Sequence, residues 1–170
     1  CLMAILPTYN DKGVALLDVG ANAENQASHL NDFAVMGSVY STLVRGIKKP
    51  KVALLNIGTE EKKGNEVHQE TYQLLKENDK IHFVGNIEGR DILNGDVDVI
   101  VTDGFSGNIA LKSIEGTAMI LMKCIKESMM SSTKGKLGAL LAKDSLYALK
   151  DKFDYKSVGG ALMVGFEKAV

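Results

Sequence analysis

Short apolar runs alternate along the chain with longer segments whose apolar residues recur every three or four positions. Four runs of four to six residues are rich in β-branched side chains, and we expect each to form a strand: residues 14–19, 52–57, 81–84 and 97–102. Because these runs are almost continuously apolar, they are typical of parallel strands covered by helices on both faces. The alternation predicts a three-layer α/β/α fold with a largely parallel sheet, forming a single domain over residues 1–170.

Three longer segments have helical spacing: residues 30–44, 65–78 and 106–130. We expect Ser28 or Asn31 to begin the first helix and Gly46 to end it. That helix is apolar nearly all round, which is typical of a helix that is buried or faces another subunit. The second is an ordinary amphipathic helix, and the third is long with an apolar stripe.

Composition narrows the class of protein. The 170 residues are 45% hydrophobic, which excludes a disordered chain or a small disulfide-stapled one. Twenty Lys+Arg against twenty-one Asp+Glu give a formal charge of -1, so nucleic acid is not an expected partner. No apolar run reaches the roughly 18 residues of a spanning helix and no leader is recognised, so we expect an intracellular protein. The start at Cys1, without an initiator Met, suggests a chain that begins inside a larger protein.

Cysteine and carboxylate spacing give no metal or redox signal. Cys1 and Cys124 make no disulfide framework, and Cys124 lies in an apolar run, which predicts a buried thiol rather than a nucleophile. Asp96 and Asp98 alternate onto one face of a strand, away from its tip. We therefore predict no metal and no cofactor.

Polar turns follow each predicted strand and contain glycine with Asn, Asp, Glu or Thr: residues 19–22, 57–65, 84–88 and 102–108. Parallel strands place their carboxyl ends on one edge of a sheet, so we expect these turns to meet there and form the active site. Glycine lets backbone N–H groups approach a ligand closely, and helix N-termini favour anions. A single such turn is equally typical of a tight connection without a ligand.

Two of the turns carry the clearest candidate chemistry. The turn at 102–108 offers two glycines and a hydroxyl at the start of the long helix, with Lys112 further along it. The loop at 57–65 holds paired acids and paired lysines, so that Lys63 could bind a phosphate oxygen while Glu60 positions it. The alternative for this loop is a solvated run of charges.

The segment at 131–155 is amphipathic and helical in pattern. Leu137, Leu140 and Leu141 interleave with lysines, which is typical of a helix lying in a membrane interface. The alternative is a helix that faces the core and turns its lysines to solvent.

Several blocks together resemble the bacterial phosphate acyltransferase family, PlsX: residues 16–22, 36–40, 55–66, 101–108 and 159–161. The resemblance implies a fold similar to isocitrate and isopropylmalate dehydrogenases and to phosphotransacetylases. It also implies a cytoplasmic homodimer, peripherally associated with the membrane, that converts acyl-[acyl carrier protein] and inorganic phosphate into acyl phosphate. This product would feed a glycerol-3-phosphate acyltransferase in phospholipid synthesis. Family members are substantially longer than this chain.

The implied chemistry suits the predicted edge. Phosphate is a competent nucleophile at neutral pH, so the enzyme must mainly position it and stabilise the developing oxyanion, without an acyl-enzyme. As catalytic residues we expect Lys63, Asn65, Asp103 and Asn108. As phosphate- and substrate-binding residues we expect Gly20, Asn22, Gly58, Thr59, Glu60, Gly64, Gly104, Ser106, Gly107 and Lys112.

Three other functions remain open at this stage. A short-chain phosphotransacetylase acting on acyl-CoA would use the same bond chemistry. A metal- and NAD-dependent β-decarboxylating dehydrogenase would need a carboxylate cluster, which the sequence does not suggest. A non-catalytic scaffold on the membrane surface would bind lipid without turnover.

Overall fold

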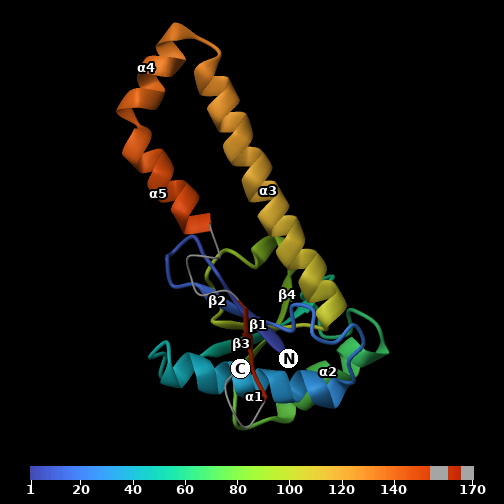
Figure 1. Ribbon diagram of the computed structural model, residues 1–170. Helices are drawn as coiled ribbons and strands as arrows, with labels where there is room; N and C mark the ends of the chain where they lie inside the picture. The colour runs from blue at the N-terminus through green and yellow to red at the C-terminus, as the bar shows by residue number, and fades with distance from the viewer. Residues whose placement is uncertain (154–160, 166–170) are drawn as a thin grey trace.

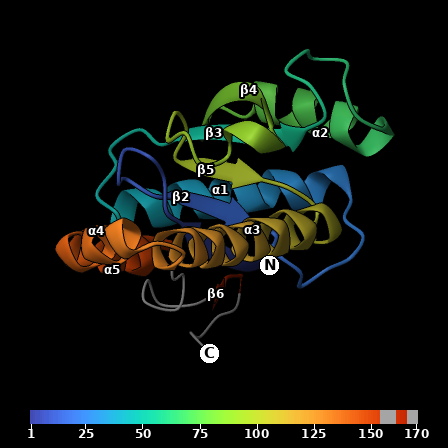
Figure 2. The same ribbon diagram turned by 90° about the horizontal axis from the view of Figure 1, so that it is seen from above.

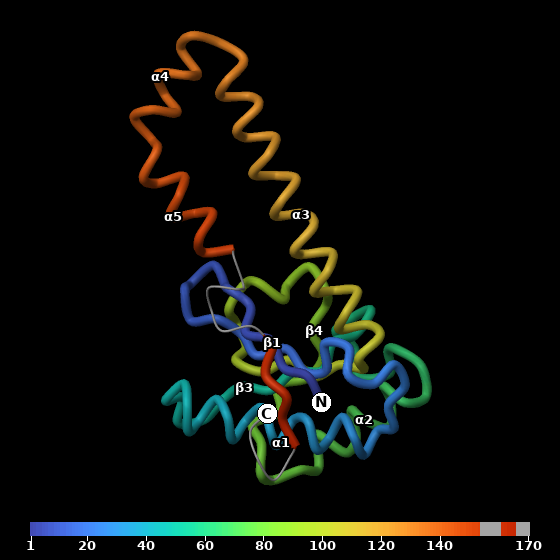
Figure 3. The backbone as a smooth tube through the Cα atoms, in the orientation of Figure 1, coloured from blue at the N-terminus to red at the C-terminus, as the bar shows by residue number. Residues whose placement is uncertain are grey.

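A six-stranded sheet with the strand order β4-β3-β5-β2-β1-β6 forms the centre of the computed structural model, which describes residues 1–153 and 161–165 (Figure 1). The strands are β1 (Leu2–Leu6), β2 (Val14–Leu17), β3 (Lys51–Asn56), β4 (His82–Glu88), β5 (Val99–Val101) and β6 (Ala161–Met163). The strand pairs β4–β3, β3–β5 and β5–β2 are parallel, which confirms the largely parallel sheet. β1 pairs antiparallel with β2 and with β6, so the two ends of the described chain lie side by side (Figure 3).

The sheet differs from the four predicted strands in three ways: β1 and β6 were not predicted, and β4 is longer than its apolar run. β1 was not predicted as a strand, because its five residues alone do not reveal the hairpin that pairs it with β2. The turn predicted at 84–88 is wrong, since β4 continues to Glu88. Gly85, at a φ of 101°, lies where the register between β3 and β4 shifts, so it forms a bulge within the strand.

The helices agree closely with the periodicity. They are α1 (Ala27–Leu43), α2 (Glu66–Glu77), α3 (Gly104–Met130), α4 (Thr133–Leu141) and α5 (Lys143–Phe153), with a short 3-10 helix at Gly89–Asp91. α1 begins earlier than expected, after Gln26, whose backbone N–H donates to His29 Nδ1 at 3.3 Å. Ser28 and Asn31 therefore lie inside the helix rather than at its start.

The sheet separates two apolar cores, which confirms the three-layer fold (Figure 2). α1 and α2 cover one face, where Leu30 and Phe33 of α1 and Leu75 of α2 are buried. The first turns of α3 cover the other face with Leu111. α1 approaches the strands closely at Gly37, where an added Cβ would lie 2.6 Å from a methyl group of Val99. Val39 and Leu43 of α1 are exposed, as is Val44 directly after the helix.

Beyond Ile114, α3 leaves the sheet, and α4 and α5 fold back beside it (Figure 1). We call residues 119–153 the distal hairpin. No described residue of α4 or α5 is buried, which argues against the alternative of a core-facing helix for this segment. Cys124 is exposed, and its predicted burial is also wrong, because α3 has no sheet beside it at that level. Residues 154–155 of the predicted segment, and 159–160 of a family block, lie outside the described residues.

Candidate active site

The carboxyl end of β2 is organised by a buried carboxylate. Asp18 is fully buried and its Oδ1 accepts N–H bonds from Leu2, Gly20 and Ala21 at 2.9–3.0 Å. Its Oδ2 accepts the backbone N–H of Asn22 at 3.1 Å and the Asn22 side-chain amide at 3.0 Å. Burial alone would raise the pKa of Asp18, but these hydrogen bonds outweigh it and hold the pKa below its ordinary value. The N–H groups of this loop therefore bind the carboxylate of Asp18, which is part of the protein itself.

The first turn of α3 packs directly against this loop. An added Cβ at Gly107 would overlap the Asp18 carbonyl oxygen, and one at Gly104 would overlap the Asn22 carbonyl oxygen. Asn108 donates from Nδ2 to the Val19 carbonyl at 3.0 Å. Backbone without side chains is thus required at both glycines, and the turns after β2 and β5 form one unit.

The backbone N–H groups at the start of α3 already donate hydrogen bonds to acceptors within the protein. Gly104 N donates to Asn25 Oδ1 at 3.2 Å, and Ser106 N donates to Asp103 Oδ1 at 2.8 Å. Gly107 N donates to the Asp103 carbonyl at 2.9 Å. A phosphate that used these amides would have to displace Asn25 and Asp103, so in this structure Asp103 acts as the cap of α3.

The loop at 57–65 is held from both of its ends. Asn56 at the end of β3 donates from Nδ2 to the Lys63 carbonyl at 3.0 Å, and its Oδ1 accepts from Ile57 N at 2.8 Å. Asn65 caps α2 by accepting from His68 N at 3.0 Å. Asn86 of β4 donates to the Glu60 carbonyl at 2.8 Å. The backbone of this loop is therefore an ordered connection.

Charged side chains on this loop remain accessible. Lys63 Nζ lies 3.8 Å from Glu60 Oε1, with 46% of the lysine side chain exposed. Both side chains fold over Gly58, where an added Cβ would lie 2.8 Å from Glu60 Oε2. Glu61 faces away from this pair toward Gln73 and Lys76 of α2, whose hydrogen bonds lower its pKa.

The remaining candidate residues lie in the turns after β2 and β3 or on α3. Gly20 and Gly64 both have positive φ, of 128° and 86°, as their turns require. Thr59 is exposed. Lys112 lies further along α3, with its Nζ 2.9 Å from Glu115.

The order of the strands fixes how these parts lie along the edge. β3 lies between β4 and β5, and β5 lies next to β2, so the loop at 57–65 adjoins the unit formed by the turns after β5 and β2. Hydrogen bonds join the turns after β2 and β5 to each other. A further hydrogen bond, from Asn86 to the Glu60 carbonyl, joins the loop at 57–65 to β4. The sheet order thus places the predicted turns after β2, β3 and β5 on one edge, as expected from the parallel strands.

Sequence reasoning missed four polar residues of this edge: Asp18, Asn25, Asn56 and Asn86. Asp18 and Asn56 are buried polar residues at strand ends, and this position was the available signal. Asn25 gave no signal, because its role depends on a contact distant in sequence, whereas Asn86 lies in the turn predicted at 84–88 but was not singled out. The Asn25 amide Nδ2 is itself buried without a hydrogen-bond partner.

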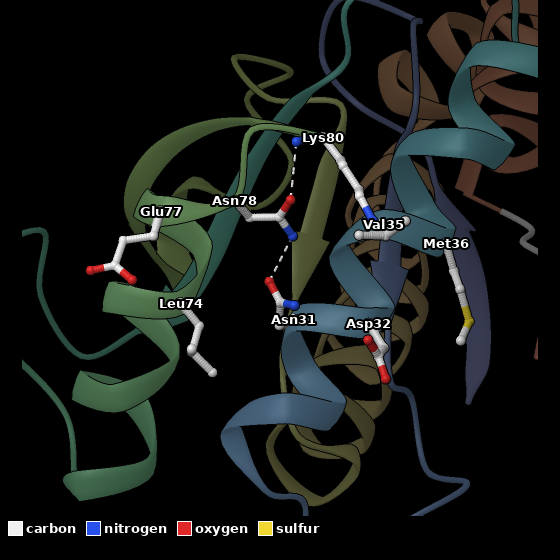
Figure 4. A pocket seen from close by; sticks show the side chains of 8 residues that line it. All are labelled: Asn31, Asp32, Val35, Met36, Leu74, Glu77, Asn78 and Lys80. Atoms are coloured by element: carbon white, nitrogen blue, oxygen red, sulfur yellow. Dashed lines mark hydrogen bonds between the residues drawn. The ribbon is translucent and has the colours of Figure 1, made fainter.

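Two cavities lie away from these turns. One, of about 470 Å³, is an open groove between α1 and α2 (Figure 4), where Asn78 donates to Asn31 at 2.8 Å. The other lies within the distal hairpin. None of the residues that line them is a candidate of the strand-tip edge. Among residues 1–153 and 161–165, no cluster of three His, Cys, Asp or Glu side chains could hold a metal ion.

Comparison with known proteins places the chain in a family. A family model described as "Fatty acid synthesis protein" matches residues 1–170. The chain belongs to this family. Similar relatives are named phosphate acyltransferase: 54% identity in Streptococcus agalactiae serotype III strain NEM316 and 52% in Streptococcus pneumoniae strain ATCC 700669, each over 99% of this chain. The match covers 52% of either relative, so the chain spans about half their length.

Solved structures support the fold of this family member. A phosphotransacetylase from Streptococcus pyogenes is 18% identical with a TM-score of 0.54, covering 69% of this chain and 41% of that one. The EutD phosphotransacetylase from Staphylococcus aureus is 22% identical with a TM-score of 0.51, covering 68% and 41%. These likenesses confirm the expected α/β fold. The family resemblance noted from the motifs is confirmed by the phosphate acyltransferase relatives.

Proposed function

We propose that the complete protein to which this chain belongs forms acyl phosphate from acyl-[acyl carrier protein] and inorganic phosphate. The observation that carries the proposal is the 54% identity to phosphate acyltransferases over 99% of the chain. A phosphate oxygen attacks the thioester carbonyl, a carbon–oxygen bond forms, and the carbon–sulfur bond breaks to release the carrier thiolate. Phosphate needs no activated side chain for this step, so binding and charge neutralisation are the main tasks of the protein.

The accessible side chains at the edge are the proposed phosphate ligands. Since protein acceptors already occupy amides of Gly20, Gly104 and Ser106, we assign phosphate binding to Lys63, with Lys112 as the second candidate. Glu60 would hold Lys63 in place between turnovers.

The thioester oxygen needs a hydrogen-bond donor of its own. The side-chain amides of Asn22 and Asn108 each commit one of their two N–H groups to Asp18 and Val19. Asn65 uses its Oδ1 to cap α2, which leaves its Nδ2 as the donor that we assign to the thioester oxygen.

The reaction is tested with the complete protein, a long-chain acyl carrier thioester and phosphate, trapping acyl phosphate with hydroxylamine. We expect a phosphate-dependent hydroxamate. Product formed from acetyl-CoA but not from the acyl carrier thioester would instead support a phosphotransacetylase. Lipid binding without hydroxamate would support the scaffold.

Replacing Lys63 with Gln is expected to raise the KM for phosphate roughly tenfold with a smaller change in kcat, because one charge-assisted contact is worth about 1.5–3 kcal/mol. Initial rates over a phosphate series measure this effect. Lys62→Gln removes the neighbouring exposed charge and serves as the control. An unchanged KM in Lys63→Gln would remove Lys63 from the phosphate site.

We also propose that the distal hairpin contacts membrane through α4. Leu137, Leu140 and Leu141 are 60%, 69% and 81% exposed, and lysines flank them. None of the helices in the described part of the chain combines the length and apolar content needed to cross a bilayer. We further propose that the complete protein is a cytoplasmic homodimer, and the exposed apolar side chains of α1 and of the hairpin support contact between two copies. Its acyl phosphate product would pass to a glycerol-3-phosphate acyltransferase.

The membrane contact is tested by flotation with anionic vesicles. Leu137→Glu with Leu141→Glu is expected to lower the bound fraction more than tenfold, since burying each leucine is worth about 1.5–3 kcal/mol. Ser128→Glu with Ser145→Glu adds the same charge to α3 and α5 and is the control. Equal release of both variants would mean that charge alone, and not insertion of α4, decides binding.

A further inference from the structure

The first turn of α2 holds the end of the loop at 57–65. His68 lies against the backbone of Gly64, where an added Cβ would lie 2.6 Å from the Cβ of His68 and 2.8 Å from its Cγ. Glycine has no side chain, so the histidine can pack directly on this backbone. Gln69, next in the helix, donates from Nε2 to the carbonyls of Lys62 at 3.0 Å and Gly64 at 3.2 Å. The start of α2 therefore fixes both the place of His68 and the backbone of the loop.

His68 makes two hydrogen bonds to one atom of Asn65. Its backbone N–H donates to Asn65 Oδ1 at 3.0 Å, and its ring Nδ1 lies 2.7 Å from the same oxygen. An amide oxygen can only accept, so the ring carries a proton on Nδ1. The two donors fix the rotation of the Asn65 amide and direct its Nδ2 away from His68. Asn65 is exposed, so this NH₂ group is accessible to a ligand.

The ring bond exceeds what a helix cap requires. An asparagine at the N-cap position accepts from one backbone N–H near the start of the helix, and Asn65 makes that bond to the N–H of His68. If the amide turned by 180°, its Nδ2 would face the backbone N–H and the ring N–H together. The ring of His68 therefore disfavours the exchanged orientation more strongly than the cap alone does.

We propose that His68 is a positioning residue for the reaction, holding Nδ2 of Asn65 toward the thioester oxygen. This inference rests on the proposed function, in which Asn65 donates that hydrogen bond. His68 acts through Asn65 and does not itself contact the substrate. A donor that is already oriented stabilises developing negative charge without reorganising during the reaction. Loss of the ring bond should therefore lower kcat and leave phosphate binding, which is assigned to Lys63, nearly unchanged.

The kinetic test uses the complete protein and the hydroxylamine assay. His68→Leu is expected to lower kcat about tenfold, with the KM for phosphate within about twofold. His68→Asn should restore kcat to within about threefold, because its Nδ2 takes the place of ring Nδ1. His68→Gln places its amide nearer to the position of ring Nε2 and should remain low. An unchanged kcat in His68→Leu, or no recovery in His68→Asn, would overturn the proposal.

Two further variants separate positioning from the stability of α2. Gln73→Leu removes a hydrogen bond from α2 to Glu61 of the same loop and is the matched control, with kcat expected to be unchanged. Asn65→Asp keeps an oxygen that accepts both bonds and removes the Nδ2 donor. In that background, His68→Leu should cause no further loss of kcat at saturating phosphate. A further loss of about tenfold would mean that His68 does not act through Asn65, and would overturn the proposal.

The ring proton can be located without turnover. In a long-range ¹H–¹⁵N spectrum at about pH 8.5, where an ordinary histidine is neutral, we expect the His68 ring to be protonated on Nδ1. Asn65→Ala should return the ring to the Nε2-protonated form that is usual in water. An Nε2 proton in the unsubstituted protein would overturn the inference whatever the activity. Absence of hydroxamate from the unsubstituted protein would contradict the proposed function, whereas full activity of His68→Leu would contradict the positioning role alone.

Discussion

Replacing Asp18 with asparagine is expected to lower the free energy of unfolding by about 3 kcal/mol, because it removes a buried charge that satisfies several donors. The asparagine Oδ1 can keep the bonds from Leu2, Gly20 and Ala21. Its Nδ2 would then face the two N–H donors of Asn22, and both hydrogen bonds would be lost. Urea denaturation of the complete protein measures the change. A loss well under 1 kcal/mol would mean that the loop does not depend on the carboxylate.

The pH dependence of stability gives a second measurement of the same group. Its folded pKa is depressed, so the ionised carboxylate stabilises the fold fully above pH of about 4, the ordinary aspartate value. This contribution is lost as the pH falls through the lower folded pKa. Asp18→Asn should therefore flatten the acid limb of the stability curve, which urea denaturation over a pH series measures.

Gly107→Ala is the second large effect that we expect, with a loss of about 3 kcal/mol or more and a matching loss of hydroxamate formation. The new methyl group would overlap the Asp18 carbonyl oxygen, which is backbone and has no alternative rotamer. α3 would have to move away from the loop after β2, and Asn108 would lose its bond to Val19. Thermal and urea unfolding measure the first effect, and the hydroxylamine assay measures the second.

Gly116→Ala is the matched control for this substitution. Gly116 lies in the same helix, and an added Cβ there meets nothing within 4 Å. Alanine has a higher helix propensity than glycine by about 1 kcal/mol, so this variant should be slightly more stable. Similar losses in both variants would show that α3 is sensitive to alanine in general, and that the contact at Gly107 is not the cause.

The sequence was most informative where local patterns and burial agree. The apolar runs predicted β2, β3 and β5 to within two residues, because strands covered on both faces leave little room for polar residues. The amphipathic pattern at 65–78 predicted α2 to within one residue at each end, and the Asn65 side chain caps its start. Parallel strand order then placed the polar turns on one edge.

Contacts between distant segments could not be predicted in this way. The motif around Asp18 was noticed for its glycine and asparagine, yet the carboxylate controls the loop through donors that include Leu2, on another strand. Gly104 and Gly107 were expected to expose amides to an anion, but Asn25 and Asp103 accept from those amides. The apolar spacing of α3 fits a buried helix as well as one that leaves the sheet. The exposure of Cys124 therefore could not be predicted from the sequence.

One consequence of the architecture concerns α3 itself. Its 27 residues form an unbroken rod about 40 Å long, since each helical residue advances about 1.5 Å. One end is anchored where Gly107 meets the Asp18 carbonyl, and the other carries the hairpin. With no hinge between them, a small tilt imposed at the far end turns the rod about its anchored foot. The proposed membrane contact of α4 and the strand tips are thereby mechanically joined through a single element.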